Sequence, residues 1–259
     1  MEYSDTDKIQ LNKYSKQQAL DTFSFSYNNK FDRSIDKLIT SLIEESDKIS
    51  EKYQYYEKLQ KEKSEKYWEL QDTLDNSGYG VDMIMMDHVQ DMMYLEEEII
   101  AICETKIIYG FKHFEISLKK LLRIAFGQND QIKKFKWHEL INFFKQKNID
   151  ISKLNGYEGI NQLRILNNVL KHSNENIDNQ IANFPEFKNK DHFHFPLLIN
   201  FYKRVKNSPV IFLASLSSEI QKYLYDFNEN RIENIAESYA LRMDKEIAEK
   251  FITKLKAKY

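Results

Sequence analysis

The amino-acid sequence predicts a nearly all-α protein, and three observations lead to that prediction. Six glycines and three prolines occur among the 259 residues, whereas ordinary usage is about 7% and 5%. The prolines Pro185, Pro196 and Pro209 all lie in the last third of the chain, and no glycine follows Gly159. A β-sandwich or a doubly wound fold needs many tight turns, and the residues that form such turns are scarce. Apolar residues instead recur at the spacings of three, four and seven that indicate helices.

The composition narrows the class of protein further. Hydrophobic residues make up 42% of the chain and include 17 Phe and 16 Tyr, which is enough to build a core and excludes wholesale disorder. The most apolar windows, 99–103 and 209–216, are far shorter than the roughly 20 residues that cross a bilayer. Residues 1–14 mix charges without an apolar block, so we expect no signal peptide. With Cys103 as the single cysteine, intrachain disulfides and cysteine zinc clusters are excluded. These features predict a cytoplasmic globular protein that does not bind a membrane.

The first part of the chain is expected to form a polar segment followed by a long helix. Residues 1–30 are rich in Asn, Ser and Gln, so we expect them to be partly irregular. A helical period then runs from Phe31 to an Asp-Asn-Ser-Gly stop signal at 75–78, with one break expected near 61–65. The apolar positions that carry this period are Ile35, Leu38, Leu42, Ile49, Tyr53, Tyr56 and Leu59. A straight helix over 31–75 would be about 65 Å long, which is typical of a helical arm.

A second long helix is expected over 82–126, where a Gly-Gln-Asn-Asp sequence at 127–130 ends it. Its clearest apolar stripe consists of Ile107, Phe111, Phe114, Leu118, Leu121 and Ala125. Shorter helices of the same periodicity are expected over 137–147, 160–172, 210–227 and 231–258. The polar stretch 173–195 is expected to be broken, with one short strand around 192–195. The sequence thus divides into a polar segment 1–30, a helical arm 31–81 and a helical bundle 82–259.

Charge is segregated along the chain. Residues 44–104 hold 17 acidic and 6 basic residues, and residues 106–147 hold 10 basic and 3 acidic residues. The basic stretch also contains Tyr109, Phe111, Phe114, Phe135 and Trp137. Basic residues interleaved with aromatic ones can hold a nucleic-acid backbone. The same stretch is equally well explained as a solvated helix face that pairs with the acidic arm, and the sequence leaves both explanations open.

Common catalytic and metal-binding motifs are absent from the sequence. It contains no GxxxxGK[ST], GxGxxG, HExxH or GxSxG, which removes the usual phosphate-loop, dinucleotide, zinc-protease and serine-hydrolase interpretations. His192 and His194 would share one side of a strand, a geometry that metals use, but no cluster of other ligands completes a site. We therefore predict no metal and no cofactor. Cys103 lies in an apolar helical stretch and is expected to be a buried, inert thiol.

The segment 156–173 carries the strongest functional signal. On a helix Arg164, Asn168 and His172 share one face, because they are separated by four and four residues. Together with Lys171 they could form a site for an anion or a phosphate group near the end of that helix. The alternative is a capping and ion-pair cluster that fixes the loop after the helix.

The sequence LRILNNVLKHS, which follows a long helix carrying YGFKHFEISLKKLL, resembles a HEPN domain (higher eukaryotes and prokaryotes nucleotide-binding) over roughly residues 82–227. The resemblance implies an up-and-down helical bundle. Many members of the family are metal-independent ribonucleases of toxin–antitoxin, abortive-infection and CRISPR-linked defence systems. Their signature is an arginine, then Asn, Asp or His, then a histidine after four to six intervening residues. Here Asn167 takes the place of that arginine, Asn168 follows it and His172 is the histidine, whereas Arg164 lies one turn earlier.

Carried over residue by residue, the resemblance implies a role for each of these side chains. His172 would be the general acid or base when a ribose 2′-OH attacks the adjacent phosphate. Arg164 would stabilise the phosphorane charge, and Asn168 would orient the substrate or the histidine. Such sites in the family usually form across a dimer. The residues expected to assist in substrate binding are Lys171, Asn167, Lys119 and Glu115.

Two hypotheses about function follow from this resemblance. The first is a metal-independent endoribonuclease or toxin-type effector of prokaryotic antiviral or abortive-infection defence, which cleaves tRNA or mRNA as a homodimer. The alternative is a catalytically inactive module that binds RNA, a nucleotide or a partner protein and serves as a scaffold or adaptor. An antitoxin or another defence-system protein is the expected protein partner.

Overall fold

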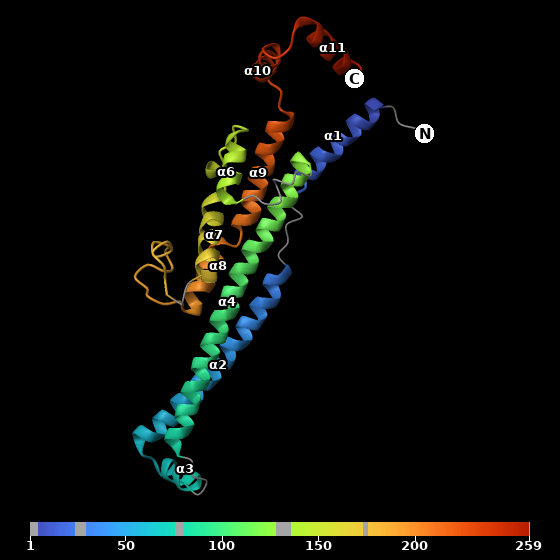
Figure 1. Cartoon of the computed structure of the whole chain (residues 1–259). Helices are drawn as coiled ribbons and strands as arrows, with labels where there is room; N and C mark the ends of the chain where they lie inside the picture. Colours follow the sequence, from blue (N-terminus) through green and yellow to red (C-terminus); the bar gives the residue numbers. More distant parts are fainter. Residues whose placement is uncertain (1–4, 24–29, 76–79, 128–135, 173–175, 259) are drawn as a thin grey trace. The chain divides into compact units, whose positions relative to one another are not determined.

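A computed structural model describes most of the chain, namely residues 5–23, 30–75, 80–127, 136–172 and 176–258. Over these residues the predicted all-α fold is confirmed (Figure 1). The helices are α1 (Asp5–Asp21), α2 (Lys30–Glu62), α3 (Glu65–Asp75), α4 (Val81–Phe126), α6 (Trp137–Lys145), the 3-10 helix η2 (Ile151–Lys153), α7 (Tyr157–His172), α8 (Phe195–Val205), α9 (Ser208–Tyr225), α10 (Glu229–Ala240) and α11 (Lys245–Lys256). None of these helices is both long enough and apolar enough to cross a membrane.

The chain forms two compact units. We call the first the central unit; it comprises Asn29–Phe114 and Gly159–Lys206. The second, which we call the terminal unit, comprises Met1–Asn28, Glu115–Glu158 and Asn207–Tyr259. Helix α4 contributes to both, since its residues up to Phe114 belong to the central unit and the remainder to the terminal unit.

In the central unit α2 and α4 lie side by side (Figure 1). The rings of Tyr56 and His88 are 5.8 Å apart, and the Gln60 side chain donates a hydrogen bond to Asp82. The break predicted near 61–65 is confirmed, because α2 ends at Glu62 and Lys63 has a positive φ of 43°. The stop signal expected at 75–78 falls largely outside the described residues.

The predicted apolar stripe of α4 is confirmed, since all six of its positions are buried. In the central unit α8 is an addition to the predicted helices. It begins at Phe195, with Pro196 in its first turn. Proline fits there because the backbone N–H groups of the first turn have no intrahelical hydrogen-bond acceptor, so the N–H that proline lacks is not needed. The strand predicted around 192–195 is therefore wrong. His192 makes a single bridge to Asn176 instead.

The polar stretch before α8 is held in place by aromatic side chains. Phe184, Phe187 and Phe193 are buried, and the Phe184 and Phe187 rings lie 5.9 and 5.8 Å from the ring of Phe201 on α8. Arg204 on α8 also donates two hydrogen bonds to Glu186, of 2.7 and 2.9 Å. These contacts order a segment whose polar composition predicted only irregular backbone.

In the terminal unit the partly irregular segment expected over residues 1–30 contains helix α1. Leu20 and Phe23 are buried at its end, and the Leu20 carbonyl accepts a hydrogen bond of 2.8 Å from the Ser217 hydroxyl on α9. The single helix expected over 231–258 is also wrong. Asp244 caps a new helix there by accepting a hydrogen bond from the Ile247 N–H, as aspartate commonly does at helix N-termini.

Candidate functional site

Helix α7 ends at His172, as the sequence predicted. Asn168, Lys171 and His172 are exposed on its last turns, and we call these three side chains the α7 end cluster. Arg164 is half-buried one turn earlier. Its Nε and Nη2 atoms donate hydrogen bonds of 3.3 and 2.9 Å to Oδ1 of Asn161. The predicted face therefore exists on α7, but its arginine is engaged within its own helix.

Asn167 lies on the buried, apolar face of α7. It is 1% exposed, because it is four residues after Leu163 and so shares the apolar face of the helix. Its Nδ2 donates a hydrogen bond of 3.1 Å to Oδ1 of Asn168. Its own Oδ1 has no hydrogen-bond partner among the described residues. The residue at the position of the family's arginine therefore does not present its side chain to a substrate.

Glu115 and Lys119 lie one turn apart on α4, and they belong to the terminal unit. The α7 end cluster belongs to the central unit. Within the central unit the structure brings together Asn168, Lys171 and His172, whereas Glu115 and Lys119 are part of the other unit.

The central unit also contains a polar network that the sequence analysis missed. Lys106 on α4 is 9% exposed, and its Nζ donates a hydrogen bond to Oδ1 of Asp36 on α2 and lies 4.5 Å from the centre of the Tyr202 ring. The Tyr202 hydroxyl donates a hydrogen bond of 2.7 Å to Oδ1 of Asp32. Three helices thus contribute four polar groups to one connected network. Buried polar networks of this kind are costly unless their members are satisfied.

Gly110 makes this network possible. A Cβ atom at position 110 would lie 3.0 Å from Cε2 and 3.1 Å from the hydroxyl oxygen of Tyr202. Since both contacts are tighter than ordinary van der Waals packing, a larger residue would require the Tyr202 ring to shift by a few tenths of an ångström, so glycine favours this close approach to α4. The ring then stabilises the Lys106 ammonium from one side through a cation–π contact.

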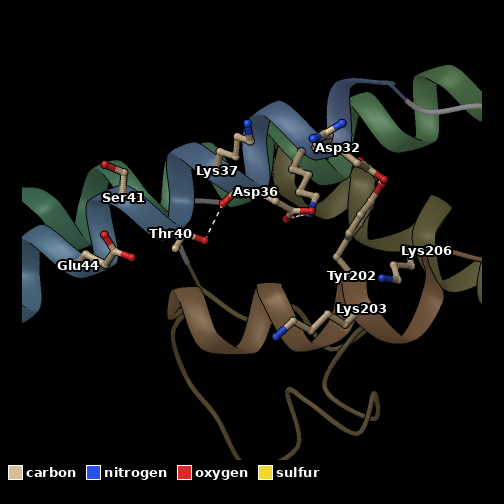
Figure 2. A pocket seen from close by; sticks show the side chains of 11 residues that line it. Asp32, Asp36, Lys37, Thr40, Ser41, Glu44, Tyr202, Lys203 and Lys206 are labelled. Carbon is tan, nitrogen blue, oxygen red and sulfur yellow. Dashed lines mark hydrogen bonds and ion pairs between the residues drawn. The ribbon is translucent and has the colours of Figure 1, made fainter.

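The network lies in an open cleft of about 780 Å³, which we call the α2–α8 cleft (Figure 2). Figure 2 shows α2 on one side of it and α8 on the other, with Lys203 and Lys206 on the α8 side. The remaining basic residues that line it are Arg33 and Lys37 of α2. Burial raises the pKa of Asp32, although the Tyr202 hydrogen bond and the nearby Lys106 charge oppose that rise. A cleft that contains a perturbed carboxyl group and several charged groups is a candidate binding site.

One local signal pointed to the cleft. Lys106 follows Cys103 by three residues and precedes Gly110 by four, so a lysine occupies the buried face of α4. A charge at such a position requires a partner inside the protein. The sequence gives no hint of which partner, because Asp36 is 70 residues away.

The structure supports the expectation that Cys103 is an inert thiol. Its side chain is buried, and burial raises its pKa to about 12. Across the described part of the chain, no group of three or more His, Cys, Asp or Glu side chains could hold a metal ion. Of the two histidines considered as metal ligands in the sequence, His194 has its Nδ1 atom 3.2 Å from a carboxylate oxygen of Glu96.

Comparison of the chain with protein-family models, with curated proteins and with solved structures finds no significant match.

Proposed function

We propose that this chain is a HEPN-like helical bundle with a long N-terminal helical arm, and that it binds RNA through the α7 end cluster. The observation that carries the proposal is the exposure of Asn168, Lys171 and His172 side by side at the end of α7. An amide, an ammonium and an imidazole can each donate a hydrogen bond to a phosphate oxygen. The expected ligand is a tRNA or an mRNA in the cytoplasm of a prokaryote, and an antitoxin or another antiviral-defence protein is the expected protein partner.

Binding is favoured over catalysis by the position of the other two motif residues. Asn167 is buried and carries no charge, and Arg164 donates hydrogen bonds from two of its nitrogen atoms to Asn161. A phosphorane-like transition state requires a cation that is aimed at the developing charge. Only Lys171 provides an exposed cation within the α7 end cluster, so the cluster is better suited to hold a phosphate than to cleave beside it.

The test is the affinity of the full chain for a fluorescently labelled single-stranded RNA, measured by anisotropy at low salt. We expect the Asn168→Ala/Lys171→Ala variant to bind about tenfold more weakly, since it loses two phosphate contacts. The matched control is Asn183→Ala/Lys188→Ala, which removes an exposed amide and an exposed lysine from the same unit. Equal affinity of both variants and the wild type would refute RNA binding at this cluster.

A metal-independent endoribonuclease is the second candidate, and the exposed imidazole of His172 favours it. In this mechanism His172 removes the proton of a ribose 2′-OH, the oxygen attacks the adjacent phosphorus, and the 5′-oxygen leaves. Lys171 of the cluster and Arg164 stabilise the phosphorane, Asn168 orients the substrate, and a homodimer completes the site. The products are a 2′,3′-cyclic phosphate and a 5′-hydroxyl. Cleavage of total RNA in EDTA by the wild type, and its loss in His172→Ala, would establish this activity.

A further inference from the structure

We infer that the α2–α8 cleft is a second binding site, and that its ligand is a small molecule bearing two or more phosphate groups. This site is separate from the α7 end cluster and does not rest on the function proposed for it. The inference depends on the charge that the cleft presents, on its size and on the unequal exposure of its central ion pair.

The cleft presents uncompensated positive charge. Its lining contains five basic and three acidic residues. Asp36 pairs with Lys106, and Asp32 accepts a hydrogen bond from the Tyr202 hydroxyl and is attracted by the Lys206 charge, so basic residues exceed acidic ones by two in this lining. The four remaining cations are exposed and form no ion pair with any residue that the structure describes; they are Arg33, Lys37, Lys203 and Lys206. Clustered charge in a concave site attracts ligands of the opposite sign.

The arrangement of these cations favours a ligand with several negative charges. Arg33 and Lys37 are one turn apart on α2, and Lys203 and Lys206 are one turn apart on α8. A ligand in the cleft therefore meets one pair of cations from each helix. Several negative groups on one ligand can pair with several of these cations at once, whereas a single carboxylate supplies only one negative charge. The volume of about 780 Å³ is also in the usual range of small-molecule sites, roughly 300–1,000 Å³.

The central ion pair explains how a phosphate oxygen could reach the deepest cation. The side chain of Lys106 is 10% exposed, but that of its partner Asp36 is 63% exposed. Asp36 can rotate into solvent at little cost, whereas Lys106 cannot leave the interior. A phosphate oxygen that replaces the Asp36 carboxylate keeps the buried ammonium paired, so the exchange avoids the penalty of an isolated buried charge. The Tyr202 ring supports the ammonium in both states.

The backbone of an RNA strand is a different ligand with the same phosphate chemistry. It could contact the exposed lysines at the rim, but the cation that distinguishes this cleft is the nearly buried Lys106. Because Lys106 is only 9% exposed, a small anion is better suited to contact it than the backbone of a polymer. We therefore favour the small ligand, and the experiment below separates the two.

The experiment is a calorimetric titration of the full chain with inorganic tripolyphosphate at low salt. The test variant is Lys203→Gln/Lys206→Gln. The matched control is Lys188→Gln/Lys190→Gln, which makes the same change of charge at two exposed lysines outside the cleft lining. We expect the wild type and the control to bind tripolyphosphate with similar affinity and the test variant to bind about tenfold more weakly.

A second variant, Lys106→Met, tests the buried cation directly. It keeps the long apolar side chain and leaves Asp36 exposed to solvent, so it creates no buried unpaired charge and is expected to fold. We expect it also to bind tripolyphosphate about tenfold more weakly, with an unchanged circular dichroism spectrum.

Three outcomes would overturn the inference. The first is no detectable binding of tripolyphosphate by the wild type at millimolar concentration. The second is an equal loss in the cleft variant and in the control, which would indicate a general effect of surface charge. The third is an RNA oligonucleotide that binds through Lys203 and Lys206 while tripolyphosphate does not bind.

Discussion

Gly156 offers a sharp test of the packing in the terminal unit. Its φ is +83°, and a Cβ atom there would lie 2.7 Å from the Ser208 carbonyl oxygen and 2.8 Å from the Phe212 nitrogen. Both neighbours are backbone atoms of α9 and cannot rotate away. Replacement by alanine costs about 1–2 kcal/mol for the left-handed backbone and about 1–3 kcal/mol for the overpacking. We therefore expect Gly156→Ala to lower the free energy of unfolding by about 2–5 kcal/mol.

Gly127 provides the matched control for this prediction. Its φ is +80°, but no atom of the described residues lies within 4 Å of the Cβ that alanine would add. Gly127→Ala should therefore show only the backbone cost of about 1–2 kcal/mol. Urea unfolding followed by circular dichroism would measure both variants against the wild type. An equal loss of stability in the two variants would refute the close approach of Gly156 to α9.

Three further substitutions test individual interactions in the central unit. Burial raises the pKa of Asp32, so ionisation of its carboxyl group destabilises the folded state. The wild type should therefore lose stability relative to Asp32→Asn as the pH rises from about 4 towards 7. Urea unfolding at both pH values would measure this difference. Burial alone would raise the pKa of Glu186, but its hydrogen bonds with Arg204 and its own backbone N–H lower it overall. Glu186→Gln should thus cost about 1 kcal/mol at pH 7, and the cost should vanish as the pH falls below about 4; equal costs at both pH values would contradict this. Asn167→Arg places a charge at a buried position and should cost more than about 3 kcal/mol, whereas Asn168→Arg, at an exposed position, should change stability by less than about 0.5 kcal/mol.

Much of the fold could be predicted because it depends on local patterns. The apolar stripe of α4 and the break at Lys63 follow from periodicity within a few turns of helix. Helix α1 could not be predicted in this way, because its polar sequence is stabilised by the burial of Leu20 and by a hydrogen bond to Ser217, 197 residues away. The alternation of His and Phe over residues 192–195 was misleading, because it suggested a strand, whereas Pro196, which suits the first turn of a helix, indicated the start of α8.

The two candidate sites also differ in whether their residues are close together in the sequence. The α7 end cluster could be predicted because its three residues lie close together in the sequence, on neighbouring turns of one helix. The α2–α8 cleft could not, since Tyr202 and Asp32 are 170 residues apart and Tyr202 lies on the helix that the sequence did not reveal. The burial of Asn167 could have been predicted, because it follows Ile160 by seven residues and Leu163 by four, which places it on the apolar face of α7.

The most direct test of RNA binding by the α7 end cluster is a titration of the full chain with single-stranded RNA, followed by the NMR signals of the histidine rings. His138, whose side chain is 70% exposed on α6, serves as the internal control, and His172→Ala and His138→Ala assign the two signals. We expect the His172 signal to shift in proportion to the RNA bound while the His138 signal stays in place. RNA binding without any shift of the His172 signal would contradict the proposal that the end of α7 contacts RNA.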